Sequence, residues 1–272
     1  MNYKKITFVG AGNMTRSIIA GLVASGYPAE LITATNPSSG KRDELASSFS
    51  INTSSDNIES VREAEVVVLA VKPQIMESVA QELKQLDLSN KLIISIAAGI
   101  KCQRFNEMFG QTLKLVRVMP NTPSLVGLGM SGLYAASNVD EADRQYASEL
   151  MAAVGKTCWV EEESGINNVI AAAGSAPAYF FLFMEAMQSE AMAQGFDKQT
   201  SRMLVQQAAI GAAHMVEANP DIELSTLREQ VTSKGGTTAE ALRTFNEQQL
   251  SDIVAKAMQA AVTRAEEMEN LF

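Results

Sequence analysis

The chain is poor in histidine, cysteine and tryptophan, and it lacks any excess of positive charge. Its 272 residues include 1 His, 2 Cys and 1 Trp, and 31 Asp and Glu stand against 22 Lys and Arg, so the formal net charge is −9. A nucleic-acid binder neutralises phosphates with Lys and Arg, so this balance argues against such a partner. The two cysteines, Cys102 and Cys158, have no metal-ligand spacing. We therefore expect no metal site and a reduced, cytoplasmic protein.

Long hydrophobic runs and a leader segment are also missing from the sequence pattern. The first five residues, Met1 to Lys5, lead straight into an apolar strand pattern, so we expect no signal peptide. No apolar stretch approaches the roughly 18 residues that a membrane span needs, so no membrane partner is expected. Hydrophobic residues still make up 46% of the chain, which is enough for a substantial core.

Residues 1–160 alternate short apolar runs with amphipathic stretches. The expected strands are residues 6–9, 31–35, 66–71, 92–96 and 113–119, and the expected helices are 14–25, 41–49 and 74–86. The run at 66–71 is apolar throughout, as in a strand that is buried on both faces. Strands that alternate with helices predict an α/β domain, 1–160, with a Rossmann-type parallel sheet and right-handed crossovers.

Residues 161–272 change rhythm and predict an all-α domain. The expected helices lie near 165–194, 198–218, 224–232, 238–246 and 249–269, and the Gly174–Pro177 stretch is expected to kink the first of them. Residues 180–184 are apolar all round, which indicates a buried helix. So few helical residues cover such a surface with difficulty, and we predict a homodimer through this half. The alternative is a monomer in which that helix packs internally.

A glycine loop joins the first expected strand to the first expected helix. Gly10 and Gly12 occupy the first two positions of the dinucleotide fingerprint, where they allow a tight turn and a close approach to a pyrophosphate. Thr15 stands at the third glycine position, so the fingerprint is incomplete. The alternative is an ordinary α/β turn that binds nothing.

The end of the second expected strand indicates which cofactor is used. An NAD binder carries an acidic residue here to hold the ribose 2′-hydroxyl, and this chain has Asn36 instead. A 2′-phosphate could be met by the residues that follow, which are Ser38, Ser39, Lys41 and Arg42. This favours NADPH over NADH. The alternative for Lys41 and Arg42 is a solvated helix start.

The segment 231–239 places Gly235 and Gly236 among four hydroxyl residues, between two expected helices. A glycine pair is costly inside helical sequence, so we expect unusual backbone angles or the close approach of a ligand. A loop that feeds a helix N-terminus suits a small anion such as a carboxylate. The alternative is a plain turn with a capped second helix.

Taken in order, these segments resemble the pyrroline-5-carboxylate reductase family over essentially the whole chain. The motifs that carry the resemblance are Gly10–Met14, Ala70–Pro73, Met119–Pro123 and the segment 231–239, the last being the most specific. The resemblance implies reduction of 1-pyrroline-5-carboxylate to L-proline with NAD(P)H, the last step of proline biosynthesis. It also implies a Rossmann domain, a helical dimerisation domain, and dimers that often assemble into decamers.

The same resemblance implies a set of site residues. The cofactor would be bound by Gly10, Gly12, Asn13, Met14, Asn36, Ser38, Ala70, Lys72, Pro73, Pro120 and Asn121. The substrate carboxylate would be bound by the amides and hydroxyls of Ser233, Gly235, Gly236, Thr237 and Thr238. The Thr238 hydroxyl would reach the ring nitrogen of the substrate. For Lys72, a solvated lysine at a strand end is the alternative.

The reaction that the resemblance implies fits the scarcity of acid–base groups. A cyclic imine is already electrophilic, so hydride transfer needs orientation above all. The one histidine, His214, is expected to be a packed or surface residue.

Two rival functions are weighed against this one. A member of the β-hydroxyacid dehydrogenase family, from what is known of that family, needs a lysine on the first long helix after its Rossmann domain. This chain has no Lys, Arg or His between Lys156 and Lys198, which argues against alcohol oxidation. A non-enzymatic NADP-binding sensor would keep the first glycine loop and could lose the second, so the intact segment 231–239 counts against it.

Overall fold

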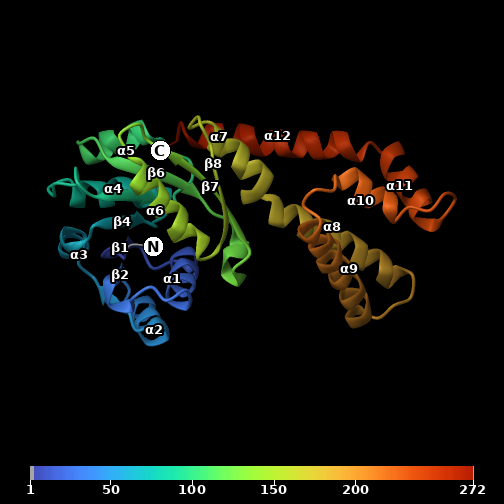
Figure 1. Ribbon diagram of the computed structural model, residues 1–272, viewed down its shortest axis with the longest axis horizontal. Helices are drawn as coiled ribbons and strands as arrows, with labels where there is room; N and C mark the ends of the chain where they lie inside the picture. The colour runs from blue at the N-terminus through green and yellow to red at the C-terminus, as the bar shows by residue number, and fades with distance from the viewer. Residues whose placement is uncertain (1–2, 272) are drawn as a thin grey trace. The chain divides into compact units, whose positions relative to one another are not determined.

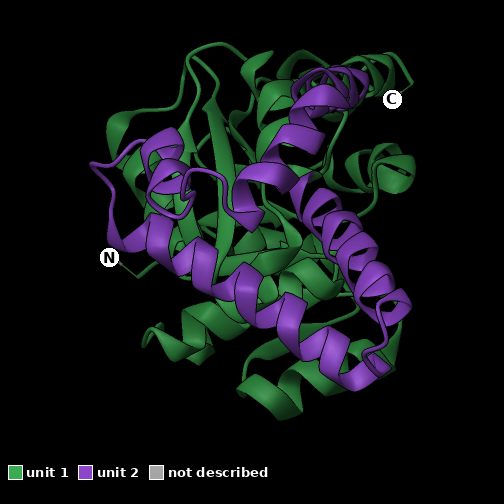
Figure 2. Cartoon of the chain, turned by 90° about the vertical axis from the view of Figure 1, so that its right-hand side faces the viewer, with its two compact units in different colours: residues 1–175, 261–272 green, residues 176–260 purple. Residues whose placement is uncertain are grey.

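The structure is a computed structural model, in which residues 3–271 are described. Met1, Asn2 and Phe272, at the outer ends of the two predicted domains, lie outside the described residues. The chain forms two compact units (Figure 2). Among the described residues, the sheet unit comprises residues 3–175 and 261–271, and the helical unit comprises Ala176–Ala260. The chain therefore passes between the units twice, after Ser175 and after Ala260. The division at residue 160 that we expect from the sequence stays a prediction.

The sheet unit contains one eight-stranded sheet in the order β3-β2-β1-β4-β5-β6-β7-β8 (Figure 1). The strands are β1 Ile6–Val9, β2 Ile32–Thr35, β3 Asn52–Ser54, β4 Val66–Leu69, β5 Leu92–Ser95, β6 Lys114–Met119, β7 Gly129–Ala135 and β8 Gly155–Trp159. Neighbouring strands are parallel except for β6 and β7, which pair antiparallel. All five expected strands are present, and the sequence pattern missed β3, β7 and β8.

The missed strands lack the apolar runs that mark the others. Strand β3 is three polar residues, and β7 contains two glycines. Gly129 of β7 and Gly155 of β8 approach so closely that a Cβ on Gly155 would lie 2.0 Å from the Gly129 carbonyl oxygen. Gly155 also has φ +150°, which L-residues with a side chain rarely adopt. Close backbone packing therefore stabilises this edge, and a hydrophobic pattern cannot reveal it.

Two separate cores lie on the two faces of the sheet. Phe8 of β1 and Val68 of β4 pack with residues of α1 and α6, whereas Val9 and Leu69 of the same strands pack with residues of α3, α4 and α5. This alternation follows from the two-residue period of a strand. The helices of this unit are α1 Asn13–Ala24, α2 Ser39–Phe49, α3 Asn57–Glu63, α4 Pro73–Leu83, α5 Cys102–Phe109, α6 Glu141–Ala152 and α7 Gly165–Val169, with short η1 Ala29–Leu31, η2 Thr122–Val126 and a π-helical turn η3 Ile170–Gly174.

The helical unit confirms the expected rhythm of the second half. Its helices are α8 Ala176–Ala193, α9 Lys198–Ala218, α10 Leu224–Gln230, α11 Thr237–Glu247 and the first part of α12 Leu250–Met268. The last residues of α12 belong to the sheet unit. The four helices expected after residue 197 are each found within two residues of their predicted ends, because the 3.6-residue pattern is strong there. The first expected helix, 165–194, is found as α7, η3 and α8 in succession.

The helix that contains α8 corrects one expectation. A continuous helix, Gly165–Ala193, is 29 residues long and is apolar enough to span a membrane by length and composition alone, although we expected no such stretch. The four residues Phe180 to Phe183 are 44% to 67% exposed in the single chain. The structure therefore does not show the internally packed helix that a monomer would need.

Candidate active site

The order of the strands places a ligand-binding edge beside β1. Successive strands run outward from β1 to β3, and the chain then returns to add β4 on the other side of β1. In open parallel sheets, ligands bind at the carboxyl ends of the strands on either side of such a reversal. Here those ends are followed by Gly10 after β1 and Ala70 after β4. The fold thus brings together two motifs that the sequence singles out separately.

Gly10 and Gly12 are glycines for different reasons. A Cβ on Gly10 would lie 2.6 Å from the carbonyl oxygen of Ala70, and Gly10 has φ +111°, so the turn itself requires glycine. A Cβ on Gly12 would meet nothing within 4 Å. Gly12 caps the N-terminus of α1, where no side chain caps the helix and the first turn carries no acidic residue. Bare backbone N–H groups at a positive helix end suit a phosphate.

Thr15, which departs from the glycine fingerprint, is buried in the same turn. Its hydroxyl donates a 2.8 Å hydrogen bond to the carbonyl of Gly10. The third glycine of the fingerprint usually allows close packing of the helix on the strand. In this chain the Thr15 side chain instead ties the first turn of α1 to the glycine loop.

The end of β2 presents polar groups at the N-terminus of α2. The backbone N–H of Asn36 bonds the Ser54 carbonyl at 3.2 Å, and the Arg42 side chain donates to the Asn36 carbonyl at 2.6 Å. Ser38 and Lys41 are exposed, and the first turn of α2 carries no acidic residue. The structure therefore places the residues expected around the ribose on one exposed helix start.

The end of β4 leads into α4 through the second motif. Lys72 is the N-cap of α4, and Pro73 is its first residue, where a missing N–H costs nothing. Ala70 donates its N–H to the carbonyl of Val9, the last residue of β1. Lys72 is exposed, so the solvated-lysine alternative for this residue stays open.

Asn121 follows β6 and is buried. Its Nδ2 donates to the carbonyl of Ala173 at 3.0 Å, and its Oδ1 accepts from the N–H of Met130 at 2.9 Å. Both ends of the amide are therefore used within the sheet unit. The sequence shows no sign of either contact, because Met130 lies on the missed strand β7 and Ala173 lies on a helix far from Asn121 in the chain.

The segment 231–239 lies wholly in the helical unit. Gly235 has φ +70°, so the unusual backbone angle expected of the glycine pair is present. A Cβ on Gly236 would lie 2.3 Å from the Ser233 hydroxyl oxygen, and Gly236 is the N-cap of α11 with no side chain capping it. Thr237 and Thr238 begin α11 and are exposed. A hollow of about 320 Å³ borders this segment at Thr232.

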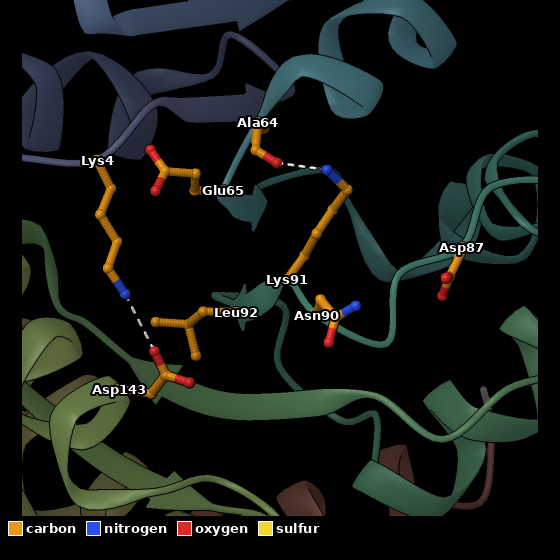
Figure 3. Close-up of a pocket in the computed structure, with 8 residues that line it drawn as sticks. All are labelled: Lys4, Ala64, Glu65, Asp87, Asn90, Lys91, Leu92 and Asp143. Atoms are coloured by element: carbon orange, nitrogen blue, oxygen red, sulfur yellow. Dashed lines mark hydrogen bonds and ion pairs between the residues drawn. The ribbon is translucent and has the colours of Figure 1, made fainter.

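A cavity of about 370 Å³ lies at the opposite, amino edge of the sheet (Figure 3). It is lined by Lys4, Ala64, Glu65, Asp87, Asn90, Lys91, Leu92 and Asp143, none of them a predicted site residue. Its lysines are already paired: Lys4 with Asp143 at 3.1 Å, and Lys91 with the backbone carbonyls of Arg62 and Ala64.

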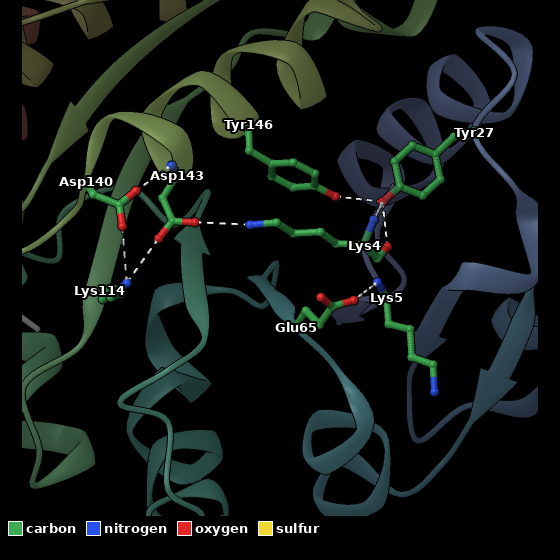
Figure 4. Close-up of polar contacts among 8 residues, drawn as sticks. All are labelled: Lys4, Lys5, Tyr27, Glu65, Lys114, Asp140, Asp143 and Tyr146. Atoms are coloured by element: carbon green, nitrogen blue, oxygen red, sulfur yellow. Dashed lines mark hydrogen bonds and ion pairs between the residues drawn. The ribbon is translucent and has the colours of Figure 1, made fainter. Parts of the chain in front are cut away.

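The same edge holds a polar cluster that joins α6 to the residues before β1 and to the start of β6 (Figure 4). Lys114 reaches Asp140 and Asp143, and the hydroxyls of Tyr27 and Tyr146 lie 2.7 Å apart. We interpret this edge as structural.

The remaining chemically reactive side chains lie away from these motifs in the sequence. His214 is exposed and lies 3.6 Å from Glu217, as expected for a surface residue. Burial, together with the neighbouring Glu163 carboxylate, raises the pKa of the Cys102 thiol to about 12. Within residues 3–271, no group of three or more His, Cys, Asp and Glu is arranged to hold a metal ion.

Comparisons with known proteins agree with this geometry. Residues 163–268 match the family model described as pyrroline-5-carboxylate reductase dimerisation, and residues 5–99 match the model described as NADP oxidoreductase, coenzyme F420-dependent. A pyrroline-5-carboxylate reductase of Vibrio alginolyticus is 70% identical over 272 residues, which is the whole length of both chains. The chain belongs to the pyrroline-5-carboxylate reductase family.

Solved structures of the family share the fold. The reductase of Coxiella burnetii superposes with a TM-score of 0.94 at 41% identity, covering 98% of this chain and 99% of that one. The Plasmodium falciparum enzyme, solved with NADP bound, gives a TM-score of 0.87 at 31% identity and covers 99% of both chains. The predicted family, its Rossmann-type sheet with a helical C-terminal region, and its oxidoreductase class are confirmed.

Proposed function

We propose that this member of the family reduces 1-pyrroline-5-carboxylate to L-proline and uses NADPH. The observation that carries the proposal lies at the carboxyl edge of the sheet, where no side chain caps the N-terminus of α1. A Cβ on Gly12 would meet no protein atom within 4 Å, so packing within the protein does not require a glycine there. NADPH supplies the hydride when it is bound. The chain's own residues bind and orient both molecules, and no general acid is needed to make a cyclic imine electrophilic.

The cofactor site that we propose follows the carboxyl ends of four strands. Gly10, Gly12, Asn13 and Met14 hold the pyrophosphate, and Asn36 and Ser38 lie at the ribose. Ala70, Lys72, Pro73, Pro120 and Asn121 border the nicotinamide. The fit is supported by the free space at Gly12 and by the fixed backbone of Gly10 against Ala70.

The preference for NADPH over NADH rests on the start of α2. Ser38 and Lys41 are exposed there, and Arg42 is held beside Asn36, so hydroxyl and cationic groups surround the expected 2′-position. A double variant, Lys41→Ala with Arg42→Ala, should lower kcat/KM for NADPH by about tenfold or more, roughly the loss of one charge-assisted contact. Its kcat/KM for NADH should change little. A wild-type preference for NADH would sink this part of the proposal.

The substrate site that we propose is the segment 231–239. The amides and hydroxyls of Ser233, Gly235, Gly236 and Thr237 bind the carboxylate, which suits the uncapped N-terminus of α11. The Thr238 hydroxyl orients the ring nitrogen. Orientation by fixed donors supplies most of the catalysis in a reaction of this kind.

We also propose that the protein forms a homodimer through the helical region. As the family resemblance implies, such dimers would assemble into decamers. The exposed apolar residues of α8 lie within the region that matches the dimerisation model. In our proposal, a second copy of the chain, and not lipid, covers these apolar residues of α8. We also propose a cytoplasmic location and the domain ranges 1–160 and 161–272.

Hybrid dimers test whether one site draws on two chains. Gly12→Val chains lack the proposed cofactor site, and Thr238→Ala chains lack the proposed substrate group. If the cofactor site of one chain works with the substrate segment of the other, mixing the two impaired variants raises the activity above that of either variant alone. If each active site is built from one chain, the mixture stays as impaired as its components.

The proposed activity is tested by NADPH oxidation in the presence of 1-pyrroline-5-carboxylate, with proline measured as the product. Turnover that yields one proline for each NADPH supports the proposal. Tight NADPH binding without turnover would leave the sensor function or another imine as the substrate.

A further inference from the structure

The last residue of β2, Thr35, is polar and fully buried, with 0% of its surface exposed. Its hydroxyl donates a 2.5 Å hydrogen bond to Oδ1 of Asn57, the first residue of α3, whereas the Phe8 carbonyl lies 3.4 Å away and is the poorer acceptor. Nδ2 of Asn57 in turn donates to Oε2 of Glu82 in α4 at 3.0 Å. The Thr35 hydroxyl therefore joins the end of β2 to α3 and, through Asn57, to α4, all within the sheet unit.

The backbone of the same residue holds the first glycine loop. The N–H of Gly10 donates to the Thr35 carbonyl at 3.0 Å, and the N–H of Asn36 donates to the Ser54 carbonyl of β3 at 3.2 Å. Gly10 belongs to the proposed pyrophosphate site, and Asn36 belongs to the proposed ribose site. Thr35 thus bonds the first of these sites directly and precedes the second by one peptide bond.

The hydroxyl of Thr35 is not what a strand needs in order to fold. Valine has nearly the same shape, is equally β-branched and suits a strand as well. Burying a hydroxyl costs free energy, and the hydrogen bond that it makes adds little net stability beyond offsetting that cost. What the hydrogen bond does supply is direction, because it fixes where the end of β2 lies relative to the start of α3.

The position of this strand end matters to a ligand that reaches both proposed sites. Two contacts made by one molecule reinforce each other only when the distance between the two sites matches the molecule. The pyrophosphate site follows β1, and the ribose site follows β2. Thr35 lies between them, bonded to Gly10 by its carbonyl and to Asn57 by its hydroxyl.

We propose that Thr35 is a positioning residue for the cofactor, and that its hydroxyl sets the separation of the pyrophosphate and ribose sites. The bond to Asn57 holds the end of β2 in place, and the Thr35 carbonyl holds the Gly10 N–H at that place. This inference rests on the proposed cofactor site for its effect on binding, whereas its effect on the strand end can be measured without any cofactor.

Two substitutions at Thr35 separate the hydroxyl from the methyl group. Thr35→Val removes the hydroxyl, and Thr35→Ser keeps it while removing the methyl group. We expect Thr35→Val to raise Kd for NADPH by about threefold to tenfold, the loss of roughly one net hydrogen bond, and Thr35→Ser to bind NADPH as the wild type does. An unchanged Kd in Thr35→Val, or an equal rise in both variants, would overturn the proposal.

The matched control is Thr7→Val. Thr7 is also buried, and its hydroxyl also bonds α3, donating to the Ser60 carbonyl at 2.9 Å, but it lies within β1 and belongs to neither proposed site. Thr7→Val should lower Tm about as much as Thr35→Val and should leave Kd for NADPH at the wild-type value. An equal rise of Kd in the two valine variants would mean that the effect is a loss of stability alone, and the proposal would be wrong.

A ligand fragment tests whether separation is the quantity that Thr35 controls. Adenosine 2′-monophosphate carries the 2′-phosphate and lacks the pyrophosphate, so it needs no fixed distance between the two sites. We expect wild type and Thr35→Val to bind it with the same Kd, although they differ toward NADPH. If the fragment loses as much affinity as NADPH does, Thr35 supports the ribose site alone and does not set the separation.

Hydrogen exchange of the cofactor-free protein tests the strand end itself. The amides of Gly10 and Asn36 should exchange faster in Thr35→Val than in Thr7→Val, compared under conditions of equal loss of Tm. Equal exchange in the two variants would overturn the proposal. A wild-type protein that binds no NADPH would refute the proposed cofactor site instead, and the exchange result would still decide whether Thr35 fixes the strand end.

Discussion

Asn121 Nδ2 donates a 3.0 Å hydrogen bond to the carbonyl of Ala173, four residues before Pro177. In a regular helix that carbonyl would accept from the N–H of residue 177, but proline has none. The helix meets the break with a π-helical turn, η3, in which Ser175 N–H bonds the Ile170 carbonyl at 2.7 Å. The predicted interruption at Gly174–Pro177 is therefore present as this turn, and Asn121, two residues after the end of β6, supports it.

Removing this support should destabilise the protein. Asn121→Ala leaves the Ala173 carbonyl and the Met130 N–H, both half-buried, without their side-chain partner, at a cost of up to about 1–3 kcal/mol for each group. Asn121→Asp should cost more, because it turns an oxygen toward the Ala173 carbonyl. Urea unfolding measures both, with Asn138→Ala as the control, since Asn138 is exposed and its Nδ2 donates to the Leu113 carbonyl. Equal losses for Asn121→Ala and Asn138→Ala would contradict the role given to Asn121.

The two glycines of the first loop should respond differently to substitution. Gly12→Val should fold with a near-wild-type Tm, because a Cβ there meets nothing, and should weaken NADPH binding by about tenfold or more, which is about 1.4 kcal/mol. Gly10→Ala should lower Tm, because its Cβ would lie 2.6 Å from the Ala70 oxygen. Thermal scans and NADPH titration measure the two effects. Normal NADPH binding by Gly12→Val would refute the pyrophosphate assignment.

Thr238 should matter for the imine and not for the cofactor. Thr238→Ala should lower kcat/KM for 1-pyrroline-5-carboxylate by roughly 10- to 1,000-fold, as when an orienting contact is lost. Its Kd for NADPH should not change. Thr244→Ala is the control, because Thr244 lies on the same helix and bonds the Glu240 carbonyl. Unchanged kinetics in Thr238→Ala would remove this residue from the site.

The buried tyrosines should make the protein sensitive to alkali. Burial, and next the hydrogen bond with Tyr27, raises the pKa of Tyr146 above the ordinary value of 10.0. Above pH 10.0 the folded state keeps a proton on Tyr146 that the unfolded state loses. The contribution of Tyr146 to the free energy of unfolding is therefore complete below pH 10.0 and falls as the pH rises further. One such group contributes about 1.4 kcal/mol per pH unit. Tyr146→Phe should make the fall in unfolding free energy shallower above pH 10, and identical slopes would contradict this.

The sequence predicted the elements that carry strong periodicity. All five apolar strands and all five C-terminal helices were predicted, because burial on both faces or along one helix face leaves a readable pattern. It missed β7, whose glycines pack backbone against backbone, and it gave no sign that β7 runs antiparallel to β6. It also missed the contact of Thr35 with Asn57, since partners so far apart in the chain are found only when the fold brings them together.

For the candidate site, the sequence predicted each motif separately but not which motifs lie side by side. Gly10 and Ala70 are 60 positions apart, and only the strand order shows that they meet. The segment 231–239 was predicted to need unusual backbone angles, and Gly235 has them. The binding roles of these residues stay predictions, since they depend on bound ligands.

The most direct test of the proposed reaction follows the hydride itself. NADPH that carries deuterium at both positions of the nicotinamide C4 is incubated with the protein and unlabelled 1-pyrroline-5-carboxylate, and the proline is analysed by mass spectrometry and NMR. We expect one deuterium in each proline, bound to C5, the former imine carbon. Proline without the label, or NADPH oxidation without proline, would contradict the account.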